Sequence, residues 1–341
     1  MKKIAILTSG GDAPGMNACI RACVRSAVNS GLEVFGVERG YYGLVNNCIT
    51  QMNAHSVCDI VQRGGTILKT ARCLEFKLPE TRKKAADNLK ALGIEGLVVI
   101  GGDGSFTGAR CLSDENGINV VGIPGTIDND LAYTDYTLGF DTAVNTVLWA
   151  INNLRDTMTS HDRVSLVKVM GRRCGDIALY SGICGGAEYI LVPEVPYDIQ
   201  AIAEDIKKSK ERGKTSNIIV LAEGAGNEQE IKTIVSVISG ADVKVTTLGH
   251  IQRGGTPTMA DRMLAARFGT RATELLIEGK TNRVIGIKNN KIIDLDITEA
   301  LSQTKKIDKH LYDMASKTLL RSPCNPFNPD KYNPYKNDKN L

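Results

Sequence analysis

Pro124-Gly125-Thr126-Ile127-Asp128-Asn129-Asp130 follows an apolar run at residues 118–123, and this junction decides the fold. The run has the length and composition of a buried parallel strand, so the residues after it form a loop at the carboxyl end of that strand. Ligands of open α/β sheets bind at that end of the strands. Asp128 and Asp130 therefore place two carboxylates where an active site is expected.

A second glycine-rich turn comes directly after another apolar run. Residues 97–100 predict a strand, and Gly101-Gly102-Asp103-Gly104-Ser105 follows it. Such turns expose backbone N–H groups to phosphates, and a nearby carboxylate can ligate a metal ion. Asp103 could merely cap the next helix, but its place between glycines after a buried strand favours a role linked to Mg²⁺. With a carboxylate nearby to accept a hydroxyl proton, these are the parts of a phosphoryl-transfer site.

The N-terminus shows the same order of strand, turn and helix. Residues 4–7 predict a short strand, residues 8–15 a glycine-rich turn, and residues 16–30 a helix. This order directs backbone N–H groups and the positive end of the helix toward an anion. Gly11 is therefore a candidate for close backbone approach to a nucleotide phosphate, although a tight turn alone would also explain it.

Short apolar runs alternate with helical patterns along the rest of the chain, which predicts an α/β fold with mainly parallel sheets. We expect further strands at residues 34–37, 164–169, 189–192, 218–221 and 283–288. We expect further helices at residues 80–92, 139–158, 200–213 and 261–278. The end of the chain, residues 323–341, is rich in Pro, Asn, Asp and Lys and predicts a polar tail.

Composition excludes several classes of protein. The 341 residues suggest two domains or one very large one, and the net charge of +4 is spread too evenly for a nucleic-acid binder. The nine cysteines include no C-x-x-C pair, and no histidine is near Cys19 and Cys23, so we expect small core residues in a reducing compartment and no structural zinc site. No signal peptide or membrane-spanning run is visible. We therefore expect a soluble, cytoplasmic enzyme.

Three motifs identify a family. PGTIDND at 124–130, GGDGS at 101–105 and TSGGDAPGMNA at 8–18 resemble the bacterial ATP-dependent 6-phosphofructokinases, and the resemblance runs from residue 1 to about 320. GGDG alone would be a weak signal, because NAD kinases and lipid kinases use similar turns. GGDG followed about twenty residues later by PGTIDND is specific.

The resemblance implies an architecture that periodicity does not show. It implies two similar Rossmann-like lobes with mainly parallel sheets, an active site in the cleft between them, and a homotetramer with shared sites. Each domain would be discontinuous. The ATP-binding domain would contain residues 1–139 and 251–302, and the fructose 6-phosphate-binding domain residues 140–250 and 303–322.

The resemblance also implies a reaction, the committed step of glycolysis: transfer of the ATP γ-phosphoryl group to O1 of fructose 6-phosphate. Asp128 would accept the O1 proton, and Asp103 would help to hold Mg²⁺. The groups implied to stabilise developing charge are Gly11, Arg72, Thr126 and Arg172. The implied ATP-binding residues are Gly11, Tyr41, Arg72, Cys73, Gly102, Asp103, Gly104 and Ser105. The implied substrate-binding residues are Thr126, Ile127, Asp128, Asp130, Arg163, Met170, Gly171, Arg172, Glu223, Lys244, His250, Ile251, Gln252 and Arg253.

In the resembled family, a separate site binds ADP and phosphoenolpyruvate as effectors. Some relatives carry arginine where this chain has Ala54, with His55 beside it, and some carry arginine where it has Lys244. Lysine keeps the charge but lacks the bidentate fork. The residues that match the effector site are Arg21, Arg25, Arg155, Gly186, Ala187, Glu188, Arg212, Lys214, Thr215 and Ser216.

Two alternatives concern the donor and the activity. Pyrophosphate-dependent relatives tend to carry aspartate in place of Gly104 and lysine in place of Gly125, so both glycines favour ATP. A catalytically silent regulatory subunit would be expected to lose Asp103, Asp128 or Arg172, and all three are present.

Overall fold

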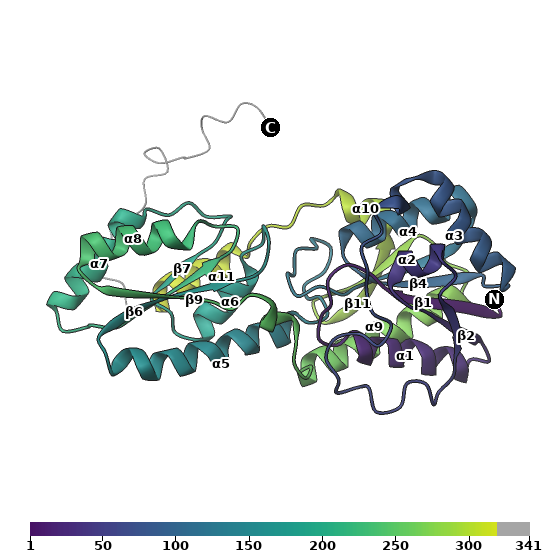
Figure 1. The fold of residues 1–341 in the computed structure, drawn as a ribbon, viewed down its shortest axis with the longest axis horizontal. Helices are drawn as coiled ribbons and strands as arrows, with labels where there is room; N and C mark the ends of the chain where they lie inside the picture. Colours follow the sequence, from purple (N-terminus) through teal and green to yellow (C-terminus); the bar gives the residue numbers. More distant parts are fainter. Residues whose placement is uncertain (319–341) are drawn as a thin grey trace. The chain divides into compact units, whose positions relative to one another are not determined.

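Strands and helices alternate along the described chain, residues 1–318 of this computed structural model (Figure 1). They group into two units. Unit 1 contains Met1–Ala143 and Arg253–Lys305, and unit 2 contains Val144–Gln252 and residues 306–318. Because the chain passes between the units more than once, each unit is discontinuous in sequence. The tail predicted at residues 323–341 lies outside the described residues.

Unit 1 is built on a seven-stranded sheet with the order β11-β10-β5-β4-β1-β2-β3. The inner strands β10, β5, β4, β1 and β2 are parallel to their neighbours, whereas β11 and β3 close the two edges as antiparallel strands. The strands are β1 Lys3–Thr8, β2 Glu33–Val37, β3 Ile49–Met52, β4 Gly96–Gly101, β5 Asn119–Pro124, β10 Arg283–Lys288 and β11 Lys291–Asp296.

Helices cover both faces of this sheet. Figure 1 shows α1 and α9 together on one side and α2, α3, α4 and α10 on the other. The helical segments of unit 1 are α1 Met16–Asn29, α2 Gly40–Val45, η1 Leu74–Lys77, α3 Pro79–Ala91, α4 Asp103–Asn116, α9 Met259–Ile277 and α10 Ile297–Ser302. The helix α5 Phe140–Thr159 starts in unit 1 and continues in unit 2, and the short helix η2 Gly249–Arg253 ends at Arg253, where the chain re-enters unit 1.

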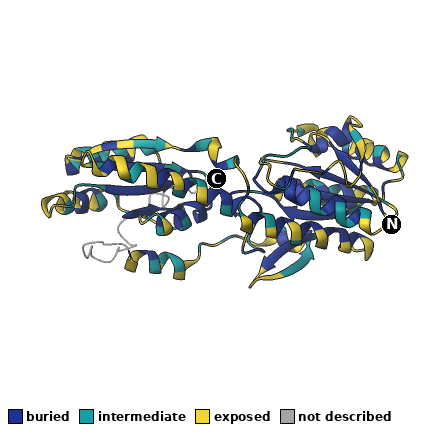
Figure 2. Ribbon diagram, turned by 90° about the horizontal axis from the view of Figure 1, so that it is seen from below, coloured by how far each residue is buried: buried dark blue, intermediate teal, exposed yellow. Residues whose placement is uncertain are grey.

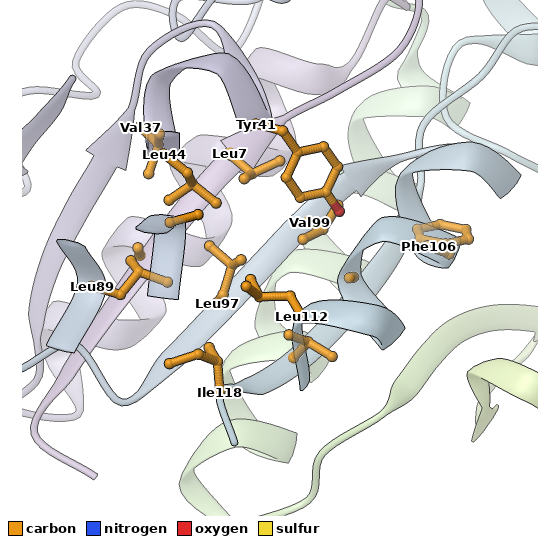
Figure 3. Close-up of a cluster of buried hydrophobic side chains, with 14 of the residues drawn as sticks. Leu7, Val37, Tyr41, Leu44, Leu89, Leu97, Val99, Phe106, Leu112 and Ile118 are labelled. Atoms are coloured by element: carbon orange, nitrogen blue, oxygen red, sulfur yellow. The ribbon is translucent and has the colours of Figure 1, made fainter. Parts of the chain in front are cut away.

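The main core of unit 1 lies between the sheet and α2–α4. Because side chains alternate across a strand, Leu7 of β1 and Leu97 and Val99 of β4 share one face. Together with Phe106 and Leu112 of α4 they belong to the cluster of buried side chains shown in Figure 3. All five are fully buried. Burial of this apolar face stabilises the sheet whose strand ends carry the predicted motifs.

Unit 2 is built on a smaller sheet, with four parallel strands in the order β7-β8-β6-β9. Its core packs β6 and β8 against α7 and α8. The strands are β6 Arg163–Val169, β7 Tyr189–Leu191, β8 Asn217–Ala222 and β9 Asp242–Thr247. The remaining helices are α6 Asp176–Cys184, α7 Ile199–Glu211, α8 Glu228–Ser239 and α11 Lys309–Thr318.

Burial follows the elements. In Figure 2 the central strands of both units are dark blue, whereas the outer faces of the helices are yellow. The predicted α/β class with mainly parallel sheets is confirmed. The strand and helix predictions missed the strands β3, β9 and β11 and the helical segments α2, α6, α8, α10, α11, η1 and η2. None of the helices in the described part of the chain is long and apolar enough to cross a membrane.

Phe106 gives a direct test of the unit 1 core. Its ring fills the space above Gly122 of β5, where an added Cβ atom would lie 2.7 Å from the ring carbons. We expect Phe106→Ala to lower the free energy of unfolding by about 3–5 kcal/mol, because it leaves a cavity in a closely packed core. Urea unfolding followed by circular dichroism measures the loss.

The control is Leu74→Ala, since Leu74 is 74% exposed. This control should change the unfolding free energy by less than about 0.5 kcal/mol. Equal losses for the two variants would contradict the assignment of Phe106 to the core.

Candidate active site

Three motif-bearing turns of unit 1 follow neighbouring strands. β5, β4 and β1 are adjacent and parallel, so the turns at 124–130, 101–105 and 8–15 emerge at the same edge of the sheet. Backbone hydrogen bonds link the turns directly. The Ser9 N–H donates to the Ile100 carbonyl at 2.9 Å, and the Gly125 N–H donates to the Gly101 carbonyl at 2.9 Å. The structure therefore brings the three predicted motifs together.

The turn at 101–105 leads straight into α4. The helix begins at Asp103 with Gly102 as its N-cap, so Asp103 lies in the first turn and not at the cap position. Asp103 is exposed, whereas Ser105 is buried. N–H groups in the first turn of a helix have no intrahelical acceptor and favour anions. This edge of the sheet thus offers N–H donors and a carboxylate side by side.

Gly104 and Gly125 face very different surroundings. A Cβ atom added at Gly104 would have no atom within 4 Å. A Cβ atom added at Gly125 would lie 2.9 Å from Ile100 Cγ2 and 3.1 Å from Met16 Cε. Gly104 therefore leaves open space beside the helix terminus, whereas Gly125 is required by packing beneath the loop.

The loop that carries Asp128 is held by its own hydrogen bonds. The Asp128 N–H donates to Thr126 Oγ1 at 3.2 Å. Thr137 Oγ1 donates to the Thr126 carbonyl at 2.6 Å, and the Leu138 N–H donates to the Pro124 carbonyl at 2.9 Å. Asp128 is 4% exposed. The loop backbone is thus fixed, and the Asp128 side chain on it is largely shielded from water, in an environment where a carboxylate can act as a general base.

The phenol of Tyr133 lies near two of the carboxylates. Tyr133 is 2% exposed, and burial raises the pKa of its hydroxyl well above the usual range, with further contributions from Asp103 and Asp130. The two carboxylates, on separate motifs, therefore act on one buried group. Across residues 1–318, no cluster of three or more His, Cys, Asp or Glu side chains forms a protein-only metal cage. One or two carboxylates are what Mg²⁺ takes from a protein when phosphates complete its shell.

Other predicted ATP-binding residues surround this edge in different ways. Arg72 is exposed on the loop before η1, and Cys73 packs partly against the core, where burial raises the pKa of its thiol. Tyr41 is buried, stacks on Phe76 with ring centroids 4.1 Å apart, and donates its hydroxyl to the Ser105 carbonyl. Tyr41 therefore braces the 101–105 turn from the core side.

Arg253 lies beside the first glycine-rich turn. A Cβ atom added at Gly11 would be 3.5 Å from Arg253 Cζ, which places a guanidinium next to the backbone expected to approach a phosphate. Both residues belong to unit 1. Arg253 was predicted as a substrate contact, and the structure puts it next to the predicted nucleotide turn.

In unit 2, predicted substrate residues gather at the carboxyl ends of β6 and β8. Arg172 follows β6 in the left-handed region, with φ 53°, and its N–H donates to Glu223 Oε1 at 2.7 Å. Gly171 before it has φ 131°, and an added Cβ atom would lie 2.4 Å from the Cys174 carbonyl oxygen. The strained turn at Arg172 is fixed by its neighbours, a pattern common at functional sites.

η2 is joined to the same strand end. Gln252, fully buried, accepts from the Met170 N–H at 3.2 Å and donates to the Gly249 carbonyl at 3.0 Å. His250 and Ile251 of this short helix are exposed. Met170, His250 and Ile251 are therefore positioned together, while the side chain of Gln252 serves to connect them.

Arg163 and Lys244 lie near the opposite edge of the unit 2 sheet, where its strands begin. Arg163 is the first residue of β6, and Arg172 lies beyond its last residue, so seven strand residues at about 3.3 Å each separate them by roughly 20 Å or more. Lys244 is near the same amino-terminal edge on β9. Asp242, which the sequence analysis missed, accepts from Arg163 Nε at 2.9 Å and pairs with Lys244 Nζ at 2.9 Å. Lys244, and then Arg163, lowers the pKa of this exposed carboxyl.

Part of the predicted effector set also gathers within unit 2. The Arg155 guanidinium donates to the carbonyls of Gly185 and Gly186 at 2.7 and 2.8 Å. Lys214 Nζ pairs with Glu188 Oε1 at 2.8 Å, and Glu188 Oε2 accepts from the Ile218 N–H at 2.6 Å. The segments 185–188 and 214–218 are therefore adjacent. These hydrogen bonds do not involve the other predicted effector residues of this region, which are Ala187, Arg212, Thr215 and Ser216.

Arg21 and Arg25 of the same predicted set are on α1 in unit 1. Arg25 contacts the loop that carries the substitution at Ala54. Its guanidinium lies 4.0 Å from Cys58 Sγ, which is 3.9 Å from His55 Nδ1. An imidazole and a guanidinium thus flank one thiol near the position where some relatives have arginine.

Comparison with known proteins gives concordant matches. The family model described as phosphofructokinase matches residues 3–276. The "ATP-dependent 6-phosphofructokinase" of Clostridium botulinum (strain Hall) is 60% identical over 316 residues, covering 93% of this chain and 99% of that protein. The matched region contains every predicted motif.

Solved structures extend the likeness to the fold. The phosphofructokinase of Saccharomyces cerevisiae superposes with a TM-score of 0.83 at 37% identity, covering 94% of this chain and 48% of that chain. This chain therefore spans about half the length of the yeast chain. A pyrophosphate-dependent phosphofructokinase from Marinobacter aquaeolei has a TM-score of 0.82 at only 20% identity, which shows a shared fold alone.

The strained turn at Arg172 separates function from stability. Glycine tolerates φ 53° without strain, so Arg172→Gly should leave the unfolding free energy unchanged or raise it by up to about 1 kcal/mol. If the arginine stabilises transferring charge, kcat for the phosphoryl transfer implied by the resemblance should fall by about 10²–10³-fold. Thermal unfolding and steady-state kinetics measure the two effects.

Asp59→Gly is the matched control, because Asp59 is exposed with φ 52° and lies outside the predicted site. It should relieve similar strain with kcat unchanged. Retention of full turnover by Arg172→Gly would remove Arg172 from the catalytic set.

Proposed function

The chain belongs to the phosphofructokinase family, and from that premise we propose how its residues share the reaction among themselves. Its activity is that of an ATP-dependent 6-phosphofructokinase, which converts ATP and fructose 6-phosphate to ADP and fructose 1,6-bisphosphate. The observation that carries the finer proposal is the meeting of three strand-end turns in unit 1, with the buried carboxylate of Asp128 on one of them.

Unit 1 is the proposed ATP-binding domain. The N–H groups at the start of α4 and the backbone of Gly11 face the phosphates, and Arg253 and Arg72 add positive charge nearby. Open space at Gly104 leaves room for a nucleotide α-phosphate, which pyrophosphate lacks. Donors fixed in advance stabilise developing negative charge without reorganisation during the reaction.

Mg²⁺ is the proposed divalent ion. Asp103 is exposed at the helix terminus and would hold it, with Asp130 close enough to act on the same buried phenol. The absence of a three-ligand cage among the described residues fits an ion that arrives with the nucleotide. When bound, the ion neutralises charge on the β- and γ-phosphate oxygens.

Asp128 is the proposed general base. Its low exposure and the hydrogen bond from its own N–H to Thr126 Oγ1 hold the carboxylate in place. The carboxylate accepts the O1 proton as O1 attacks the γ-phosphorus and the bond to the ADP oxygen breaks. Thr126 thereby fixes the loop and stays near the reacting groups.

Unit 2 is the proposed domain for fructose 6-phosphate. Arg172 supplies charge toward the transferred group, and Glu223, which accepts from the Arg172 N–H, faces the sugar hydroxyls. Met170, His250 and Ile251 complete this strand end. Because Arg163 and Lys244 are at the opposite edge of the same sheet, we assign them to the sugar 6-phosphate of a neighbouring subunit in a homotetramer.

Regulation by ADP and phosphoenolpyruvate is also proposed. Lys214 and Arg155 place two cations around the 185–188 segment, where an anionic effector could replace their present oxygen partners. Ala54 removes one anion contact that some relatives have, so weaker effector binding is expected. We propose the cytoplasm, where glycolysis takes place, as the location of the enzyme.

Asp128→Asn tests the base. The substitution keeps the shape of the side chain but removes the proton acceptor, so kcat should fall by about 10²–10⁴-fold. The dissociation constant for ATP, measured by calorimetry, should change by less than about threefold. Asp87→Asn on the exposed face of α3 is the control for a lost carboxylate and should retain wild-type kcat. An unchanged kcat in Asp128→Asn would refute the base assignment.

Lys214→Gln tests the effector site. Loss of one charge-assisted hydrogen bond should raise the concentration of ADP or phosphoenolpyruvate needed for half-maximal effect by about tenfold or more. The measurement is the initial rate at fructose 6-phosphate below its KM, with each effector titrated. Lys210→Gln is the control, since Lys210 lies four residues earlier, in α7, and its Nζ donates to the Gly240 carbonyl. Equal shifts in both variants would count against the site.

A further inference from the structure

Asp261 is a buried carboxylate that the proposed reaction does not use. It is the third residue of α9 and is 1% exposed. Its Oδ1 accepts from the Gly139 N–H at 2.8 Å, and its Oδ2 accepts from the Thr142 N–H at 2.9 Å and from Thr142 Oγ1 at 2.5 Å. The carboxylate of one helix therefore satisfies N–H groups at the start of another helix, α5.

The two helix starts hold each other in both directions. Thr258, the N-cap of α9, donates its N–H to Thr142 Oγ1 at 3.1 Å and its hydroxyl to Asp141 Oδ2 at 2.5 Å. The Asp261 N–H in turn donates to Thr258 Oγ1 at 3.3 Å. The result is a closed network in which each first turn supplies acceptors for the other.

This network is connected to the Asp128 loop by only three residues. At one end of this connection, the Gly139 N–H donates to Asp261, which restricts the movement of Gly139. On the other side, Leu138 and Thr137 donate to the carbonyls of Pro124 and Thr126 at 2.9 and 2.6 Å. The segment 137–139 thus transmits the position of α9 to the loop.

Close packing leaves this connection little room to move. Gly139 has φ 97°, and an added Cβ atom would lie 2.7 Å from Ala13 Cβ and 3.2 Å from Ile127 Cγ2. An added Cβ atom at Gly15 would lie 3.6 Å from Asp261 Cβ. The predicted nucleotide turn and the Asp128 loop therefore both pack around the same capped segment.

Keeping a charged carboxylate here is unfavourable. Burial, with a smaller contribution from the neighbouring Asp141, raises the pKa of Asp261 to about 6, against the opposing effect of hydrogen bonds from Thr142 and Gly139. A purely apolar contact could join two helices without this penalty. The carboxylate constrains the geometry more than an apolar contact would, because its two oxygens hold two N–H groups at defined positions.

We propose that Asp261 is a positioning residue for phosphoryl transfer: by holding the 137–142 segment, it sets the place of the loop that carries Thr126 and Asp128. The proposal rests on the proposed role of Asp128. It assigns to α9 a function in catalysis through hydrogen bonds alone, with no contact between Asp261 and substrate.

Asp261→Asn tests this role. The amide has one acceptor where the carboxylate has two, so one side of the cap is lost and the loop loses its fixed position. We expect kcat to fall by about 10–100-fold, with KM for ATP changed by less than about threefold. Thr273→Val on the same helix is the control. Thr273 is fully buried and bonded to Gly269 and Cys23, so its loss destabilises α9 without touching the 137–142 segment.

A double-mutant cycle distinguishes positioning from general loosening. Thr137→Val removes the hydrogen bond to the Thr126 carbonyl further along the same connection. If both residues act through one loop, their effects on log kcat are non-additive, whereas Thr137→Val and Thr273→Val add. Additive effects of Asp261→Asn and Thr137→Val would overturn the proposal.

The remaining outcomes are also decisive. Loss of thermal stability in Asp261→Asn with kcat unchanged would make Asp261 a structural residue only. If Asp261→Asn does not fold, Thr142→Val keeps the carboxylate, removes one donor to it together with the acceptor of the Thr258 N–H, and carries the cycle with Thr137→Val. Unchanged kcat in Asp128→Asn refutes the proposed base, whereas unchanged kcat in Asp261→Asn with a defective Asp128→Asn refutes only the positioning role.

Discussion

Parallel pairing of β5, β4 and β1 is the constraint on which the site depends. Parallel neighbours must end at the same edge of a sheet, so three segments far apart in sequence deliver their turns to one place. The cross-links from Ser9 to Ile100 and from Gly125 to Gly101 are continuations of the same ladder. The buried side chains beneath, shown in Figure 3, keep the ladder from shifting, because a slip in register would disrupt their close packing between the sheet and the helices.

The sequence predicted motifs that lie in consecutive residues, but it did not predict contacts between residues far apart in the chain. The strand–turn motifs at Asp103 and Asp128 were predictable because each is written in consecutive residues. The edge strands β3 and β11 escaped since their side chains are largely exposed or half-buried, and α6 escaped because it is apolar on nearly every side and shows no amphipathic stripe. For α8, the Asn227 cap was an available signal. Asp261 binds Gly139 and Thr142, which precede it by 122 and 119 positions in the sequence, so no local pattern marks this contact.

The smaller sheet of unit 2 divides its predicted substrate residues between two edges. Arg172 and Glu223 share a hydrogen bond at the carboxyl ends, whereas Arg163 and Lys244 meet at Asp242 near the amino ends. One sheet edge cannot serve a ligand at the other, since a sugar phosphate is far shorter than a seven-residue strand. The position of a residue along its strand therefore separates two groups that a motif search lists together. In this structure the two cations of the amino-terminal edge are both paired with the carboxylate of Asp242.

A pyrophosphate-dependent structure shares this fold at a TM-score of 0.82, so the fold alone does not show which phosphoryl donor is used. The two glycines that the sequence analysis expects to favour ATP have different surroundings. Gly104 borders open space, so a larger side chain there would occupy volume that a ligand could use. At Gly125 any side chain would first meet Ile100 and Met16, within the protein itself. A lysine at 125 thus requires the strand beneath the loop to be repacked as well, whereas an aspartate at 104 does not. A side chain at position 104 therefore fits without repacking, whereas a side chain at position 125 fits only if its core neighbours move.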